Sequence, residues 1–367
     1  MLSRSRGPRV PQLLDDAAGW GWRLLVVGGS LYVLGALALR LHLVVIPLLT
    51  ALLLTTLLSP VSNRLRAWGV PRSLAALLTM LLALAVLGGV GTYVVSRAAA
   101  QYPALVDQIS TLVDRSQHWL ETGPLRLGKG NVDTFGSQLV DSLRSRQGQV
   151  AHGVLSAGRT VLDVVTGMLL TFFMTIFLLY DGPRIWAWLT GLFAESSRAR
   201  VDLVGERMWR TLSGYVSGTF IVALFHGLAM GVTLAIVGVP LVAPLAVLVF
   251  LGSFIPLIGV VVFGGLAVLV TLVAKGPTTG LVVLVVLVVE NQIESHVLQP
   301  FVVGRHVRLH PLAIAVTLAS GAILAGLPGA IFAVPLVASV NAAAVALRPP
   351  REHVGAPSAA DVEAERA

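Results

Sequence analysis

Long uninterrupted runs of apolar residues are the feature that most constrains how this 367-residue chain can fold. Six runs approach the roughly 20 residues that an α-helix needs to cross a bilayer core. They cover residues 22–39, 43–58, 73–96, 160–180, 212–237 and 277–303. Charged residues make up only 12% of the chain, whereas a soluble domain carries roughly 25%. The sequence therefore predicts an all-α, polytopic membrane protein built as a helical bundle.

The residue counts exclude several classes of function. Cysteine is absent, which excludes disulfides, thiolate catalysis and cysteine-bound metals. No P-loop and no HExxH run occurs in the sequence, so we expect no catalytic residue, no cofactor and no metal site. Lys and Arg outnumber Asp and Glu by 26 to 18. In a membrane protein such arginines sit in cytoplasmic loops and set the orientation, so we expect no nucleic-acid partner.

Charge placement predicts the orientation of the chain. The N-terminus carries Arg4, Arg6 and Arg9, and the apolar run that follows lacks a cleavage site, so we expect an uncleaved first helix. Residues 97–155 carry charges of both signs and leucines at helical spacing, which predicts amphipathic helices outside the lipid. We therefore expect a multi-pass membrane protein with cytoplasmic N- and C-termini.

These observations divide the chain into five parts. We predict a cytoplasmic N-terminus over 1–21, transmembrane helices 1–3 over 22–96, an extracytoplasmic amphipathic helical insertion over 97–155, a transmembrane transport region over 156–346 and a disordered cytoplasmic tail over 347–367.

Two further apolar stretches, 241–274 and 311–346, are interrupted near their middles by Pro and Gly. The breaks lie at Pro256 and Gly259 in the first stretch and around Gly326 and Gly329 in the second. Each arm is about 14 to 17 residues, or roughly 21 to 26 Å, which is short of a ~30 Å hydrocarbon core. Each stretch could be one kinked span or a helix–turn–helix that enters and leaves on the same side.

The arginines after residue 303 favour a helix–turn–helix in each stretch. Two full spans would place Arg305 and Arg308 outside, whereas two hairpins place them inside with Arg348 and Arg351. We therefore predict two re-entrant hairpins, one from each side of the membrane. Broken backbone at membrane depth has to be buried in protein or to line a wet cavity, and opposed broken helices recur in secondary transporters.

Polar residues cluster near the end of the apolar run 277–303. Glu290 and Glu294 are four residues apart and share one helix face, with Asn291 and Gln299 nearby. An ionised carboxylate in a span is costly, so it must be protonated, paired or facing water. One hypothesis is that the two carboxylates bind a proton or a small cation. The alternative is a structural role, in which Glu294 pairs with an arginine beyond the span.

An ordered pattern of residues runs through the last third of the chain. Its members are the Pro256–Gly259 break, Glu294, Gln299–Pro300, Gly304–Arg305, His310–Pro311, Gly326 to Gly329 and Pro335. This pattern resembles the AI-2E family of transporters. The resemblance implies a permease of the bacterial plasma (inner) membrane that forms homo-oligomers, with pentamers among the forms expected. Val260 follows Gly259 where many members carry Pro, so the first hairpin departs from the family pattern.

The resemblance implies two activities. Some members look like exporters of the quorum-sensing signal autoinducer-2, and others like sodium(lithium)/proton antiporters. The expected partners are therefore the lipid bilayer, a small polar solute and the ions Na⁺, Li⁺ and H⁺. We predict a secondary transporter for a small polar solute such as autoinducer-2, with or without coupling to a cation. The alternatives are an antiporter of the same family, an envelope scaffold, and an intramembrane enzyme using Ser320 and His310.

Two sets of site residues follow. For substrate or ion binding we predict Pro256, Gly259, Glu290, Asn291, Glu294, Gln299, Gly326 and Gly329. For structural or gating roles we predict Pro300, Arg305, His310, Pro311 and Pro335.

Overall fold

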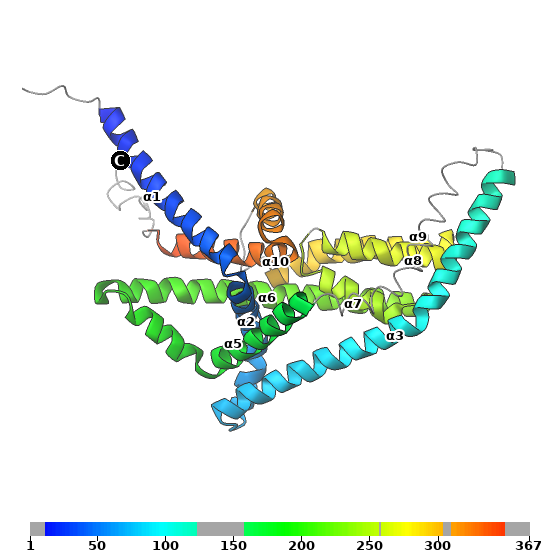
Figure 1. Cartoon of the computed structure of the whole chain (residues 1–367), viewed down its shortest axis with the longest axis horizontal. Helices are drawn as coiled ribbons and strands as arrows, with labels where there is room; N and C mark the ends of the chain where they lie inside the picture. Colours follow the sequence, from blue (N-terminus) through cyan, green and yellow to red (C-terminus); the bar gives the residue numbers. More distant parts are fainter. Residues whose placement is uncertain (1–11, 123–157, 257, 304–309, 349–367) are drawn as a thin grey trace, which may run out of the picture.

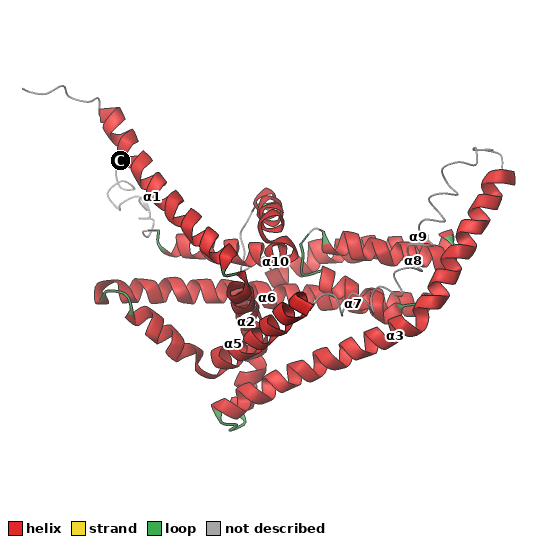
Figure 2. Ribbon diagram, viewed as in Figure 1, coloured by secondary structure: helices red, strands yellow, loops and turns green. Residues whose placement is uncertain are grey.

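The computed structural model describes residues 12–122, 158–256, 258–303 and 310–348, and over these residues the regular structure is entirely helical (Figures 1 and 2). The helices, in chain order, are α1 (Gln12–Arg40), α2 (His42–Ala67), α3 (Arg72–Thr122), α5 (Gly158–Gly191), α6 (Glu195–Val237), α7 (Val242–Gly252), the π-helix η1 (Val260–Gly264), α8 (Gly265–Lys275), α9 (Pro277–Ile293), the π-helix η2 (Glu294–Val303) and α10 (Pro311–Ala346).

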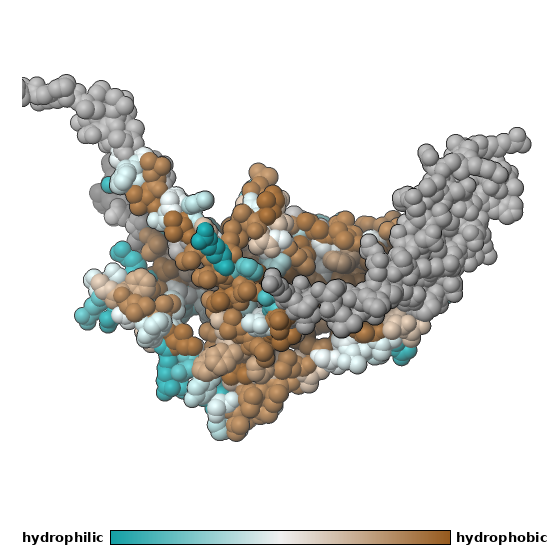
Figure 3. Space-filling view, in the orientation of Figure 1, coloured by the Kyte–Doolittle hydropathy of each residue, from teal (hydrophilic) through white to brown (hydrophobic). Residues whose placement is uncertain are grey.

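The helices have the length and surface of a membrane protein. Within the described ranges, seven of them are long and apolar enough to cross a bilayer, namely α1, α2, α3, α5, α6, α9 with the start of η2, and α10. Large apolar side chains cover the outside of the bundle, and the coloured residues of the face in Figure 3 are mainly hydrophobic with several separate hydrophilic patches. This confirms the predicted all-α, polytopic membrane architecture.

Two helices, α3 and α6, run well past the ends predicted for their apolar runs. The helix α3 does not stop at residue 96 but continues unbroken to Thr122, because Ala98, Ala99 and Ala100 bridge the apolar and amphipathic parts with strong helix formers. The helix α6 likewise joins the arginine-rich segment 195–211 to the predicted span 212–237. Residues 123–155 of the predicted insertion lie outside the described part of the chain.

The helix α5 bends at Asp181, whose φ of −130° is not helical. Pro183 accounts for the bend, because proline clashes with the preceding turn and lacks a backbone donor. Beyond the bend, the Trp186 ring packs against Gly205 of α6, and its Nε1 donates a 2.9 Å hydrogen bond to Asp202. These contacts fix the corner between α5 and α6.

The stretch 241–274 forms two short helical arms joined by a turn, with α7 packed on α6 and α8 packed on α9. Gly252 and Gly259 approach so closely that a Cβ on Gly259 would overlap the Gly252 carbonyl. A Cβ on Gly252 would overlap the Phe263 ring, although 11 residues of straight helix would separate these two by roughly 16 Å. The chain therefore turns back at this break.

The helix α10 turns back in the same way. Its helical geometry fails at Ala325 and Gly326, and the φ of 62° and ψ of −143° at Gly326 favour glycine. A Cβ on Gly321 would lie 2.7 Å from the Cβ of Ala333, whereas 12 residues of straight helix span about 18 Å. The arms 311–324 and 327–346 therefore pack against each other near the bend. Entry and exit of either hairpin on one side of the membrane remains a prediction.

Two apolar clusters mark where the hairpins meet α6. The tip cluster contains Tyr215, Val216, Ile255, Leu318, Ala330 and Val334. The base cluster contains Met230, Leu234, Val239, Leu241, Leu245, Val249, Ala267, Val283 and Leu287. Ile255 belongs to the turn of the first hairpin, and it joins residues from both arms of α10. The two hairpins therefore contact each other on α6 near Tyr215, while α7 and α9 pack on the later turns of α6 and α8 packs on α9.

A hydrogen bond from α3 holds the hinge between α6 and α7. Gln101 Oε1 accepts from the backbone N–H of Leu241 at 2.5 Å, and Leu241 has a positive φ of 62°, which is rare for a branched side chain. Gln101→Met should leave this partly buried donor without its acceptor and lower the free energy of unfolding by roughly 1–3 kcal/mol. Thermal unfolding in detergent measures the change, and Gln101→Glu, which retains an acceptor oxygen, is the matched control. An equal loss of stability in Gln101→Met and Gln101→Glu would contradict a stabilising hydrogen bond from Leu241 to Gln101.

Candidate functional site

A buried histidine joins two carboxylates inside the bundle. His226 of α6 is fully buried, and its Nδ1 lies 3.3 Å from Glu290 Oε2 at the end of α9. Its Nε2 lies 2.9 Å from Glu294 Oε2 at the start of η2. The side chain of Glu290 is 4% exposed and that of Glu294 is 17% exposed. We call these three residues the His–Glu cluster.

The local geometry of both helices places the cluster. Glu290 and Glu294 lie one turn apart across the junction between α9 and the π-helix η2, so both face α6. Along α6, His226 lies between Tyr215 of the tip cluster and Met230 of the base cluster. The His–Glu cluster is therefore a polar layer between two apolar layers. A π-helix within a helical run is uncommon and is frequent at functional sites.

One oxygen of the cluster has no hydrogen bond to any described residue. It is Oε1 of Glu290, which is buried, whereas Oε2 of the same carboxylate faces His226. A buried carboxylate oxygen normally has a partner, because its desolvation is costly. This oxygen is therefore available to a proton or to another positively charged species.

A polar face continues from the cluster along the same helix. Asn291, Gln292, Ser295 and His296 are all exposed, although they fall within the apolar span 277–298. Ser295 donates to the carbonyl of Asn291 at 2.9 Å, and the His296 ring lies 3.0 Å from the carbonyl of Gln292. Exposed amides and an imidazole are costly against lipid, which favours contact with water or protein at this face.

The structure brings two of the predicted site residues, Glu290 and Glu294, together on one partner. Asn291 is exposed and lies beside them on α9 rather than within the cluster. Gln299 and Pro300 fall within η2. Arg305 lies outside the described residues.

The predicted turn residues occupy the two breaks. Pro256 and Gly259 lie between α7 and η1, and Gly326 and Gly329 lie at the bend of α10. None of these four belongs to the His–Glu cluster.

The predicted structural or gating residues lie mainly on α10. His310 is its N-cap and accepts a 3.2 Å hydrogen bond from the backbone N–H of Leu312, and Pro311 begins the helix. Pro335 is buried in the second arm.

Sequence reasoning missed His226. The residue stands in "ALFHGLAMG", inside the apolar run 212–237, and only the flanking glycines drew attention as helix-packing residues. Its position could have identified it, because an ionisable residue inside a membrane span is rare and marks a functional site. Applied to residue 226, that rule points to a partner for the carboxylates on the run 277–303.

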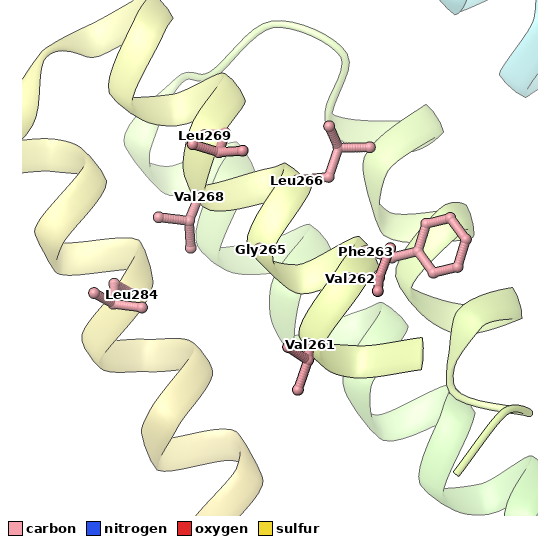
Figure 4. Close-up of a pocket in the computed structure, with 8 residues that line it drawn as sticks. All are labelled: Val261, Val262, Phe263, Gly265, Leu266, Val268, Leu269 and Leu284. Atoms are coloured by element: carbon pink, nitrogen blue, oxygen red, sulfur yellow. The ribbon is translucent and has the colours of Figure 1, made fainter. Parts of the chain in front are cut away.

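A second feature, an open hollow of about 510 Å³, lies between η1, α8 and α9 (Figure 4). Its lining is apolar throughout, with Val261, Val262, Leu266 and Leu269 among the residues drawn. It offers no side-chain hydrogen bond to a polar solute. The two features therefore differ in chemistry, because the His–Glu cluster is ionisable and this hollow is apolar.

Within the described residues, the chain combines seven apolar helices with a buried, ionisable cluster between α6, α9 and η2, which is typical of a multi-pass membrane transporter. Residues 24–348 match the AI-2E family transporters, and the chain belongs to this family. This confirms the resemblance seen in the last third of the sequence.

Three relatives show the range of similarity. The chain is 42% identical over 332 residues to "Putative transport protein MT0215" of Mycobacterium tuberculosis (strain CDC 1551 / Oshkosh), covering 90% of each protein. It is 26% identical over 302 residues to "Putative transport protein YrrI" of Bacillus subtilis (strain 168), covering 80% of this chain and 83% of the relative. It is 24% identical over 336 residues to the "Sodium-lithium/proton antiporter" of Halobacillus andaensis, covering 88% of this chain and 94% of the relative.

Proposed function

We propose that the chain is a proton-coupled secondary transporter whose coupling site is the His–Glu cluster. The observation that carries the proposal is a fully buried imidazole between two carboxylates, one of which has a buried oxygen without a hydrogen bond among the described residues. Imidazole and carboxylate both gain and lose protons, and chains of such groups are the usual proton relays of pumps and transporters.

The two hairpins supply the moving parts in this proposal. The α7 arm has 11 residues, or roughly 16 Å, and the arm formed by η1 and α8 is about 24 Å long, so neither crosses a ~30 Å hydrocarbon core. We take both hairpins as re-entrant from opposite sides, with cytoplasmic termini. Their contact at the tip cluster lies on the same helix as His226, so motion of a hairpin against α6 can reach the His–Glu cluster.

The transported species follows from the same chemistry. A small monovalent cation exchanged for a proton fits the His–Glu cluster best, and one relative carries the name sodium-lithium/proton antiporter. Export of a small polar solute such as autoinducer-2 is the second candidate. The exposed polar face of Asn291, Gln292, Ser295 and His296 favours it, because these side chains can bond to a hydroxylated solute.

Glu290→Gln and Glu294→Gln test the coupling site, because each amide keeps the size of the side chain but cannot carry the charge or the proton. In proteoliposomes with a pH-sensitive dye inside, we expect each variant to reduce proton-coupled flux of Na⁺, Li⁺ or autoinducer-2 by about tenfold or more. The control is Glu206→Gln, an exposed glutamate of α6 paired with Arg210. Unchanged flux and pH response in both test variants would refute the site.

A further inference from the structure

We propose that the hydroxyls of Tyr215 and Thr219 form a hydrogen-bonding site at the meeting point of the two hairpins, and that an oxygen of water or of a small solute occupies this site when the hairpins separate. The inference rests on the hairpin motion of the proposed function and adds the place at which the path opens. It is carried by the burial of Tyr215, by the lack of a hydrogen bond to its hydroxyl and by its position on α6.

The hydroxyl of Tyr215 is buried at the junction of the hairpins without a hydrogen bond. The residue is 7% exposed and lies in the tip cluster, among residues of both hairpins. Its hydroxyl makes no hydrogen bond to any described residue, and Thr219, one turn further along α6, lies beside it without reaching hydrogen-bond geometry. Burying such a hydroxyl is unfavourable, whereas phenylalanine would fill the same space without this penalty. The hydroxyl therefore destabilises the arrangement in which the hairpins meet.

Tyr215 and Thr219 lie on the same face of α6 as His226. Thr219 follows Tyr215 by four residues and His226 follows it by eleven, so the three side chains fall within about 40° around the helix. Eleven residues rise by roughly 16 Å, or about three turns. Glu290 Oε1, another buried atom without a hydrogen bond to the described residues, belongs to the His–Glu cluster. One face of α6 therefore has unsatisfied polar groups beside it at both levels, the hairpin junction and the His–Glu cluster.

The contacts that close the hairpins over Tyr215 are apolar. The tip cluster consists of aliphatic side chains and this one tyrosine. In the part of the chain that the structure describes, no hydrogen bond or ion pair joins one hairpin to the other. Apolar contacts are non-directional, so they can break and re-form as a hairpin moves. An oxygen that enters between the two hydroxyls gains two polar partners, which is the number that an ordered water needs.

Tyr215→Phe tests whether the hydroxyl has a structural role. The variant keeps the ring and removes the oxygen, so the unfolding temperature in detergent should be unchanged or higher. Tyr93→Phe, at an exposed tyrosine of α3, is the matched control. If Tyr215→Phe and Thr219→Val both lower the unfolding temperature by the same amount, the two hydroxyls bond to each other in the folded protein, and the inference is overturned.

Thiol labelling measures the entry of water, because the chain contains no cysteine. Ala330→Cys places a single thiol in the tip cluster, at a position that is 6% exposed. In proteoliposomes, a small water-soluble methanethiosulfonate should modify this thiol. Adding Tyr215→Phe should slow the modification by about two- to tenfold, which is the effect of losing one hydrogen bond to the open state, whereas adding Tyr93→Phe should not. Equal rates with and without the Tyr215 hydroxyl, or no modification in either protein, would overturn the inference.

Added solute distinguishes the two sources of the oxygen. Autoinducer-2 at increasing concentration should protect the Ala330→Cys thiol if the solute occupies the site, whereas labelling without protection identifies water. The labelling needs no transport, so its result is independent of the flux assay. If Tyr215→Phe slows labelling in a protein that moves no solute or cation with protons, the inference holds and the proposed function fails.

Discussion

His226→Leu should be among the most damaging single substitutions in this chain, lowering the free energy of unfolding by roughly 3–5 kcal/mol. The imidazole is the only described hydrogen-bonding partner of the Glu290 carboxylate, which is 4% exposed. Leucine would leave that carboxylate buried and unpaired. Thermal unfolding of the detergent-solubilised protein measures the loss, and we expect proton-coupled flux to disappear as well.

A combined variant shows whether the loss comes from the unpaired charge. Removing a whole buried ionic group often costs little, whereas removing one partner costs much. We therefore expect His226→Leu combined with Glu290→Leu and Glu294→Gln to recover most of the stability but none of the transport. Phe225→Leu, at the neighbouring position of α6, is the control for packing alone. A combined variant as unstable as His226→Leu would show that the imidazole acts through packing and not by pairing the carboxylates.

Gly259→Ala should disrupt the first hairpin, with a loss of roughly 1–3 kcal/mol or more in the free energy of unfolding. A Cβ at this position would overlap the backbone carbonyl of Gly252, and backbone cannot move aside as a flexible side chain can. The turn would have to open, and with it the contact of Ile255 with α10 in the tip cluster. We expect a lower unfolding temperature together with reduced flux.

Gly265→Ala is the matched control for this substitution. Gly265 begins α8, six residues further along the same hairpin, and a Cβ there would meet nothing within 4 Å. Alanine in a helix is favoured over glycine by roughly 0.8–1.0 kcal/mol, so this variant should be unchanged or slightly more stable. Equal destabilisation by both alanines would contradict the close contact between Gly252 and Gly259.

The helical bundle could be predicted from the sequence because apolar length is a property of the chain itself. The run 212–237 is long enough to cross a bilayer and the run 43–58 approaches that length, and the structure has the longer helices α6 and α2 there. The breaks at Pro256–Gly259 and Gly326–Gly329 could also be located, because proline and glycine interrupt helices for local reasons.

The packing of the hairpins and the composition of the His–Glu cluster could not be predicted, because both depend on contacts between distant segments. The fold-back of α10 is fixed by the approach of Gly321 to Ala333, and no local pattern encodes that distance. The pairing of His226 with Glu290 and Glu294 joins positions 64 and 68 residues apart. The carboxylates were identified because two of them fall on one helix face, whereas the histidine stands alone in its run and was passed over.

The length of α3 has a mechanical consequence for the first hairpin. This helix is continuous from Arg72 to Thr122, and Gln101 near its middle is bonded to the backbone of Leu241, where α6 gives way to α7. A continuous helix tilts as a rod, so displacement of its last twenty residues is passed to the Gln101 position. A force applied to α3 beyond Gln101 would therefore act, through this hydrogen bond, on the backbone of Leu241, which has a positive φ.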